Sequence, residues 1–288
     1  MAEASIPVDL LNPGQVFACL GFLEAADILC GGAEGGFHWN PSANARFDLR
    51  VEGANNPFEA VLDFLTKATV SSLSSSSSEN DTGKWQIETR RLSAGDPFPF
   101  PDPSSPATLP AELIVEGRPS IVIDHWGDDT ERDNVKFWAG SGGYPGSAIL
   151  RDALDLIRES AVGASSDPFS LCAPQSNSFR FDWRRDYIPM EIGFSLNDHA
   201  DMTTVGFPLV EVLAAIGLTN ARPQRISKLD YRYGVVSSSA LLDPIVLRAA
   251  LGCADLPFSQ RRFRMRLGWP GQENQARCIV HVSEEIAS

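Results

Sequence analysis

The sequence lacks the short motifs that mark the common enzyme classes. It contains no G-x-x-x-x-G-K-[ST] phosphate loop, no G-x-S-x-G nucleophile elbow, no H-E-x-x-H zinc motif and no C-x-x-C pair. Histidine is also scarce, since only four are present and they are dispersed along the chain (His38, His125, His199 and His281). We therefore expect no cofactor, no metal site and no enzymatic activity.

The chain also lacks paired cysteines and long apolar runs. Its five cysteines are odd in number and scattered, which favours reduced thiols over a disulfide framework. The apolar run at residues 16–23 is broken by Glu24 and Asp27, and no run approaches the roughly 20 apolar residues of a membrane span. The first basic side chain is Arg46, so no signal peptide is expected. These features predict a cytoplasmic protein that does not contact a membrane.

Positive charge is scarce overall but unevenly distributed. The net charge is −13. Residues 1–125 carry 7 Lys and Arg against 17 Asp and Glu, whereas residues 221–277 carry 10 against 4. Nucleic-acid affinity depends mainly on neutralised phosphates, so a chain this acidic should bind free nucleic acid poorly. If it contacts nucleic acid, we expect partner proteins to hold it in place.

Helical and strand patterns are mixed along the chain without regular βαβ alternation. The fold class predicted is α+β, with mixed helices, a largely antiparallel sheet and no Rossmann or barrel signature. Apolar periodicity, caps and breakers predict helices near residues 12–31, 58–68, 147–161, 209–218 and 244–251. Alternation predicts strands at residues 46–51, 229–236, 261–267 and 276–282, and a hairpin at 113–115 and 121–123.

The charge distribution suggests two lobes, although a single compact domain is also compatible with this length. The first lobe is acidic and covers residues 1–125, and the second covers residues 126–288 and contains the arginine-rich segments. In the first lobe, residues 71–83 are serine-rich and residues 97–110 are proline-rich. We expect both to lie at the surface, and we expect that residues 71–83 and most of residues 97–110 can be shortened without unfolding the protein.

Arginines alternate with aromatic residues in three segments, at residues 179–187, 231–233 and 261–269. Guanidinium groups bind phosphates and aromatic faces stack on bases, so such mixtures suit single-stranded or guide-paired nucleic acid. In the last segment, strand alternation places Arg262, Arg264 and Arg266 on one face at intervals of about 7 Å. The alternative is an exposed face whose arginines pair with internal acids. In the first segment, Asp182 and Asp186 could be such partners.

Two further patterns could carry chemistry. Asp124, His125 and Asp128 could support acid–base or metal chemistry, but neighbouring strand residues point to opposite faces and need not converge. The glycine-rich residues 140–146 precede a predicted helix. They could cradle a phosphate with backbone amides, or they could simply form tight turns.

Five blocks of the sequence resemble a small CRISPR-associated family. They are IPVDL at residues 6–10, NPGQVFACLGFLE at 12–24, RDNVKFWAG at 132–140, FRFDWRRDY at 179–187 and RFRMRLGWPGQ at 262–272. That family occurs in type I-U (I-G) systems and is grouped with Cascade large subunits. The resemblance spans nearly the whole chain, and it carries no catalytic motif.

The resemblance implies a non-catalytic subunit of a guide-RNA surveillance complex that contributes to target DNA recognition and antiviral defence. Its partners would be other CRISPR complex subunits, guide RNA, target DNA and a recruited helicase–nuclease. A structural adaptor without nucleic-acid contact is the alternative, as is a hydrolase or nuclease that uses Asp124, His125 and Asp128. The candidate nucleic-acid-binding residues are Lys136, Arg180, Arg184, Arg185, Arg262, Arg264, Arg266 and Trp269.

Overall fold

The computed structural model describes residues 1–40, 43–96, 98, 103, 105–126, 137, 144–160, 166–185, 203–269 and 277–285. In these ranges the helices are α1 (Pro13–Cys30), α2 (Pro57–Lys67), α4 (Gly146–Ser160), α5 (Pro208–Asn220) and α6 (Pro244–Leu251). Three short 3-10 turns are η1 (Gly83–Trp85), η2 (Pro106–Thr108) and η3 (Pro168–Ser170). The strands are β1 (Ala2–Pro7), β2 (Glu34–Asn40), β3 (Ala43–Val51), β4 (Thr69–Ser74), β5 (Glu88–Arg91), β6 (Ala111–Ile114), β7 (Ile121–Ile123), β8 (Ala173–Pro174), β9 (Val205–Gly206), β10 (Gln224–Ser227), β11 (Asp230–Ser237), β12 (Ser259–Gly268) and β13 (Cys278–Glu285).

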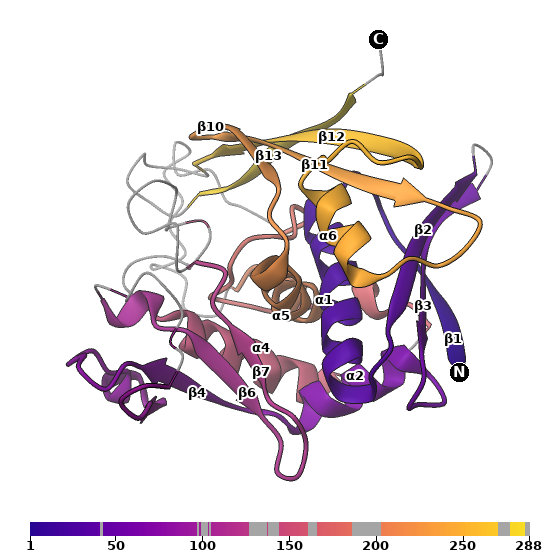
Figure 1. Cartoon of the computed structure of the whole chain (residues 1–288). Helices are drawn as coiled ribbons and strands as arrows, with labels where there is room; N and C mark the ends of the chain where they lie inside the picture. Colours follow the sequence, from indigo (N-terminus) through magenta and orange to yellow (C-terminus); the bar gives the residue numbers. More distant parts are fainter. Residues whose placement is uncertain are drawn as a thin grey trace.

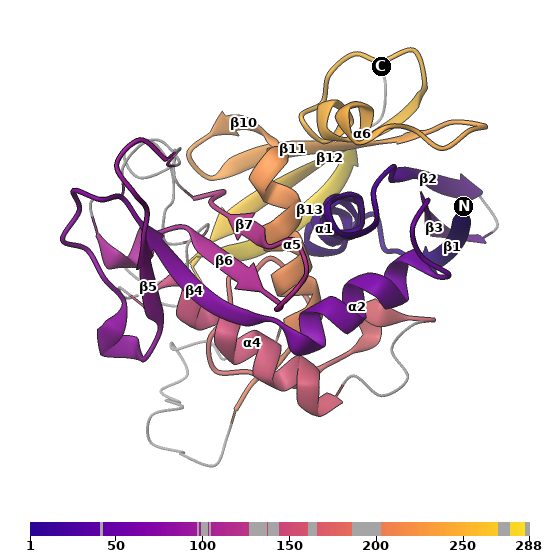
Figure 2. The ribbon, with the colours of Figure 1, turned by 60° about the horizontal axis from the view of Figure 1, so that its bottom comes forward.

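The two apolar helices α1 and α5 form the centre of the molecule (Figures 1 and 2). Nearly every residue of both helices is buried, as expected for helices that lack a polar face. By length and composition α1 could cross a membrane, but 78% of it is buried inside the protein. Its apolar surface therefore belongs to the core, where it packs against α5, α2, α6 and β3.

Three larger sheets surround this helix pair. One has the order β1-β3-β2 and another the order β10-β11-β12-β13, and both are antiparallel throughout. The third has the order β5-β4-β6-β7, with β4 and β5 parallel. Figure 1 shows β10 to β13 at the top, β1 to β3 at the right and β4, β6 and β7 below. None of the sheets in the described ranges closes into a barrel, so the predicted α+β class with largely antiparallel pairing is confirmed.

One hydrophobic core extends across the boundary between the two predicted lobes. It runs from Ile6 to Val282 and includes both α1 and α5. Tyr233 of β11 lies in it, stacks on Phe263 of β12 with ring centroids 5.1 Å apart, and donates a hydrogen bond to Leu10 O at 2.8 Å. This contact attaches the β10–β13 sheet to the segment that leads into α1.

Most of the predicted elements are confirmed. The helix that begins after Asn12 is α1, and it ends at Gly31, whose φ of 77° lies in the left-handed region that favours glycine. Asn12 occupies the N-cap position, but its side chain does not cap the helix and donates instead to Asp182. The predicted hairpin is the antiparallel pair β6 and β7.

The prediction of a surface loop at residues 71–83 is wrong for its first part. Residues 71–74 belong to β4, an interior strand between β5 and β6, and Ser72 is fully buried. Its hydroxyl lies 2.8 Å from Ser147 Oγ and accepts from Thr82 Oγ1 at 2.9 Å. Serines are tolerated in this interior because buried hydroxyl groups can donate and accept hydrogen bonds among themselves.

The proline-rich segment also ends inside the fold. Thr108 and Leu109 are buried, and Thr108 O accepts a hydrogen bond from Trp126 Nε1 at 3.0 Å. Shortening residues 105–110 would remove these contacts, so the expected tolerance to deletion does not apply there.

Candidate nucleic-acid interface

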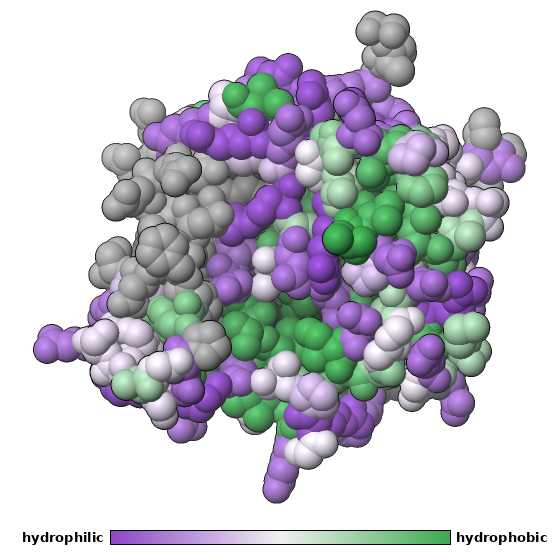
Figure 3. Space-filling model, viewed as in Figure 1, coloured by the Kyte–Doolittle hydropathy of each residue, from purple (hydrophilic) through white to green (hydrophobic). Residues whose placement is uncertain are grey.

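Strand β12 presents alternate residues to the core and to the outer face of the β10–β13 sheet. Its inward side chains are buried (Phe263, Met265 and Leu267), and its outward side chains are basic (Arg262, Arg264 and Arg266). This is the alternation that the sequence predicts. The surface that runs along these strands is mostly hydrophilic in Figure 3.

The strand register decides which side chains join the arginines on this outer face. Arg264 lies opposite Arg232 of β11 and Ser283 of β13. Arg266 lies opposite Asp230 of β11 and His281 of β13. Because directly opposed residues point to the same side of an antiparallel pair, these side chains form one polar surface.

Acidic partners engage several arginines of the sheet in close ion pairs. Arg232 pairs with Glu285 at 2.6 Å, and Arg262 pairs with Asp255 at 2.5 Å. On the other side of β12, Arg261 pairs with Glu284 at 2.6 Å. Exposed pairs of this kind contribute little to stability, about 0–1 kcal/mol each, but they offset the charge that a phosphate would meet.

Arg264 and Arg266 are different, because they share one carboxylate at long range. Their Nε atoms lie 3.5 and 3.6 Å from Asp230 Oδ1, and neither side chain makes a hydrogen bond to a residue that the structure describes. The side chain of Arg264 is 46% exposed and that of Arg266 is 63% exposed. Two guanidinium groups against one carboxylate leave an excess of one positive charge.

A groove of about 240 Å³ lies at this point of the outer face. It is lined by Asp230, Arg264, Arg266, His281 and Ser283, which come from three adjacent strands. Guanidinium, imidazole and hydroxyl groups can all donate to a phosphate oxygen. The arrangement can therefore hold an anion of phosphate size.

The arginines of the segment at residues 179–185 are held mainly by internal partners. Arg185 is buried, and its guanidinium donates to Ser178 Oγ and to the carbonyl oxygens of Gln175 and Ser176. Arg184 forms a forked contact with the buried Asp182, with a closest distance of 2.6 Å. The internal-partner alternative therefore describes both side chains. Arg180 is half-buried and has a left-handed backbone, with φ of 69°.

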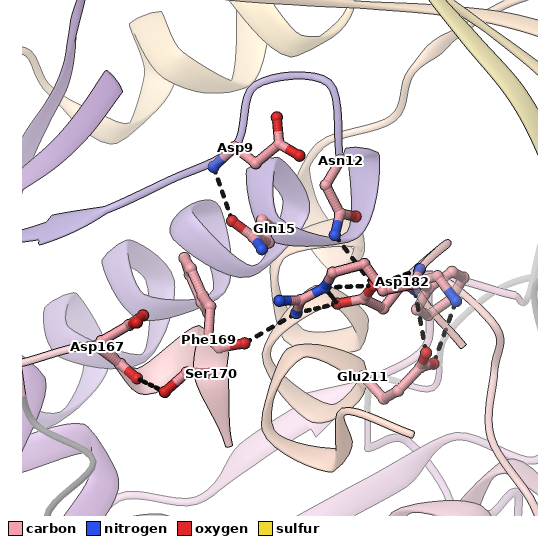
Figure 4. A network of polar contacts seen from close by, with 10 residues as sticks. Asp9, Asn12, Gln15, Asp167, Phe169, Ser170, Asp182 and Glu211 are labelled. Atoms are coloured by element: carbon pink, nitrogen blue, oxygen red, sulfur yellow. Dashed lines mark hydrogen bonds and ion pairs between the residues drawn. The ribbon is translucent and has the colours of Figure 1, made fainter. Parts of the chain in front are cut away.

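A buried network fixes this segment to the two central helices (Figure 4). Asn12 Nδ2 donates to Asp182 Oδ1 at 3.0 Å, and the carboxylate of Glu211 accepts from the backbone nitrogens of Phe181 and Asp182 at 3.2 and 3.1 Å. Burial raises the pKa of Glu211 to about 7, although the two backbone hydrogen bonds favour the charged form. The network has a structural role, and one of its members titrates near neutral pH.

The remaining candidates are dispersed. Trp269 is half-buried beneath the guanidinium of Arg277, which lies 5.0 Å from its ring centroid. Lys136, Asp128 and residues 140–143 lie outside the described residues. His125 is fully buried against the rings of Trp126, Phe179 and Phe181 and does not line the groove.

Three residues of the groove are absent from the sequence-based candidates, namely Asp230, His281 and Ser283. Alternation does place Asp230 and Arg232 on one face of a predicted strand, and His281 on another predicted strand. Sequence alone gives no register between strands, so it could not bring these residues to Arg264 and Arg266.

Among the described residues, no group of three or more His, Cys, Asp and Glu side chains is placed to hold a metal ion. In comparisons with known proteins, no protein-family model, no curated protein and no solved structure matches the chain.

Proposed function

We propose that this chain is a non-catalytic subunit of a cytoplasmic type I CRISPR guide-RNA surveillance complex, in which the outer face of the β10–β13 sheet contacts nucleic-acid phosphates. The observation that carries the proposal is the groove at Arg264 and Arg266, where two exposed guanidinium groups share one carboxylate and make no hydrogen bond to a residue that the structure describes. Phosphate contacts of this kind position a protein on a strand without reading its sequence.

The spacing of the two arginines supports a strand as the ligand. Side chains two residues apart on a β-strand are about 7 Å apart, which is close to the distance between successive phosphates. The net charge of −13 opposes binding by the isolated chain. Neighbouring subunits and guide RNA would supply the affinity, and Arg264 and Arg266 would add local contacts.

The test is the double variant Arg264→Gln and Arg266→Gln, measured in the assembled complex. Target binding should weaken, and the slope of log affinity against log salt should fall by about two, one for each lost phosphate contact. The matched control is Arg91→Gln with Arg118→Gln, which removes the same charge from exposed side chains outside this sheet. Equal effects of the two double variants, or no effect of either, would leave the groove without a role in binding.

A structural adaptor without nucleic-acid contact is the second candidate. The ion pairs of Arg232, Arg261 and Arg262 favour it, because these arginines are already matched by acids of the same chain. In that case the Arg264 and Arg266 double variant would leave target binding unchanged but would reduce the amount of the chain that copurifies with its partner subunits.

The hydrolase or nuclease alternative receives less support from the geometry. His125 is enclosed by aromatic rings, and neither Asp124 nor His125 lines the groove. Purified protein should cleave neither DNA nor RNA. Cleavage that copurifies with the chain and is lost in Asp124→Ala would reverse this assignment.

A further inference from the structure

A second cavity, of about 420 Å³, lies where the end of β1, the start of α1, η3 and β12 meet. Its polar lining consists of two carboxylates, two guanidinium groups and three uncharged side chains, namely Asp9, Asp167, Arg184, Arg261, Gln15, Asn44 and Ser170. Arg261 reaches it from the side of β12 opposite to Arg264 and Arg266, so the cavity is separate from the groove. Its volume lies in the range of small-molecule pockets.

Arg184 gives this cavity a rigid, flat wall. Its Nε and Nη2 atoms donate to Asp182, and Nη2 also donates to Phe169 O at 2.8 Å. The guanidinium carbon lies 3.6 Å from the ring centroid of Phe207, which covers one face. The Arg184 side chain is 32% exposed and lines the cavity, and its Nη1 makes no hydrogen bond to a residue that the structure describes. A guanidinium plane fixed in this way can stack on a nucleobase.

Gln15 supplies an amide donor to the cavity wall. The residue is only 6% exposed, and its Oε1 accepts from the backbone nitrogen of Asp9 at 2.7 Å. Its Nε2 makes no hydrogen bond to any residue that the structure describes. Asp9 Oδ1 accepts from the nitrogen of Leu11, and Asp9 Oδ2 accepts no hydrogen bond from a described residue. Amide and carboxylate groups are those that proteins use to read base edges.

Arg261 supplies a hydrogen-bond donor for an anionic group, although Glu284 already matches its positive charge. Its Nε and Nη2 atoms bond to the two oxygens of Glu284, each at 2.6 Å, and Nη1 makes no bond to a described residue. The cavity therefore combines a flat stacking wall, amide and carboxylate groups for a heteroaromatic edge, and a guanidinium donor for an anion.

We propose that this cavity binds one unstacked nucleotide, with the base against Arg184 and Gln15 and the phosphate at Arg261. The inference rests on the proposed function, since it names the nucleotide as the chemical class that the chain recognises. In addition to the phosphate contacts of the groove, the chain would then have a pocket that accepts a single base.

The test uses the full chain alone, titrated by NMR with AMP and UMP, with adenosine and uridine, and with inorganic phosphate. Nucleotides should bind with dissociation constants on the order of 1 mM, and nucleosides and phosphate should each bind about tenfold more weakly. Arg261→Gln should reduce nucleotide affinity to that of the nucleoside. Arg184→Lys, which keeps a charge beside Asp182 but loses the plane, should weaken nucleotides and nucleosides alike.

Arg91→Gln with Arg118→Gln is the control, because both side chains are exposed and line neither the cavity nor the groove, and it should leave nucleotide binding within about twofold. If Arg184→Lys lowers the thermal midpoint, the Arg261→Gln variant still tests the proposal. Its partner Glu284 is solvent-accessible, so the loss of the ion pair should not unfold the protein. The proposal is overturned if no nucleotide binds, if phosphate alone binds as tightly, or if Arg261→Gln changes nothing. If nucleotides bind to the isolated chain but the Arg264 and Arg266 double variant does not weaken target binding by the complex, only the proposed phosphate contacts of the groove are contradicted.

Discussion

Gly217 of α5 lies directly against Gly21 of α1, so closely that a Cβ atom on Gly217 would come within 2.6 Å of the Gly21 nitrogen. The same Cβ would lie 2.2 Å from Phe17 O, and a Cβ on Gly21 would lie 1.9 Å from Leu213 O. The obstructing atoms are all backbone, which cannot move aside without shifting a helix. The crossing of the two central helices therefore requires both glycines.

We accordingly expect Gly217→Ala to destabilise the protein by about 1–3 kcal/mol or more, since an added methyl group overpacks the crossing. The thermal midpoint measured by circular dichroism checks this. Gly83→Ala is the matched control, because its Cβ would meet only Asp81 Oδ1 at an ordinary 3.4 Å. If the two variants had the same thermal midpoint, α1 and α5 would be able to accommodate an added methyl group at their crossing, contrary to this geometry.

The pKa of Glu211 predicts a pH dependence of stability. Burial raises it to about 7, above the value of about 4.5 for an ordinary glutamate, so the folded state binds the proton more tightly than the unfolded state. The contribution of Glu211 protonation to the free energy of unfolding is fully present below pH 4.5 and is lost as the pH rises through 7. The difference is on the order of 3 kcal/mol.

Glu211→Gln cannot titrate and isolates this contribution. We expect the free energy of unfolding of the natural protein to fall, relative to that of the variant, between pH 4.5 and 7. Urea denaturation of both proteins at several pH values measures the difference. A constant difference across this range would show that Glu211 keeps an ordinary pKa.

Ser72 is expected to matter although it lies in a serine-rich segment. Its hydroxyl connects Ser147 to Thr82 inside the protein, so Ser72→Ala leaves two buried hydroxyls with fewer partners. The expected cost is about 1–3 kcal/mol in unfolding free energy. Ser76→Ala, at an exposed position of the same segment, should change stability by less than about 0.5 kcal/mol. Similar values for the two variants would favour the loop that the sequence alone predicts.

Asp230 is expected to restrain nucleic-acid binding, because it is the one described carboxylate that Arg264 and Arg266 share. Asp230→Asn removes that charge and should strengthen target binding by the assembled complex several-fold, most clearly at low salt. Asp63→Asn is the control, since Asp63 pairs with Lys67 and Arg118 in another part of the fold. Weaker binding by Asp230→Asn would mean that the carboxylate positions the arginines instead of competing with a phosphate.

Local sequence patterns determined the helices and many of the strands. Pro13 and Gly31 bound α1, and the alternation of Arg262 to Leu267 predicts both faces of β12, because capping, backbone freedom and side-chain direction depend on a few neighbouring residues. The same patterns could not identify β4, since Ser71 to Ser74 carry no apolar alternation and are buried only because β5, β6 and α4 surround them.

The candidate sites were decided by the tertiary structure. Sequence predicts Arg264 and Arg266 on one face, but only the register of β11, β12 and β13 adds Asp230, His281 and Ser283 to them. Sequence places Arg184 and Arg185 among the candidate nucleic-acid-binding residues and also offers Asp182 as an internal partner, and the fold turns both side chains toward internal acceptors. Asp182 is a near neighbour of Arg184 in the chain, but its burial depends on Asn12 and Glu211, which lie far away in the sequence and are brought to it only by folding.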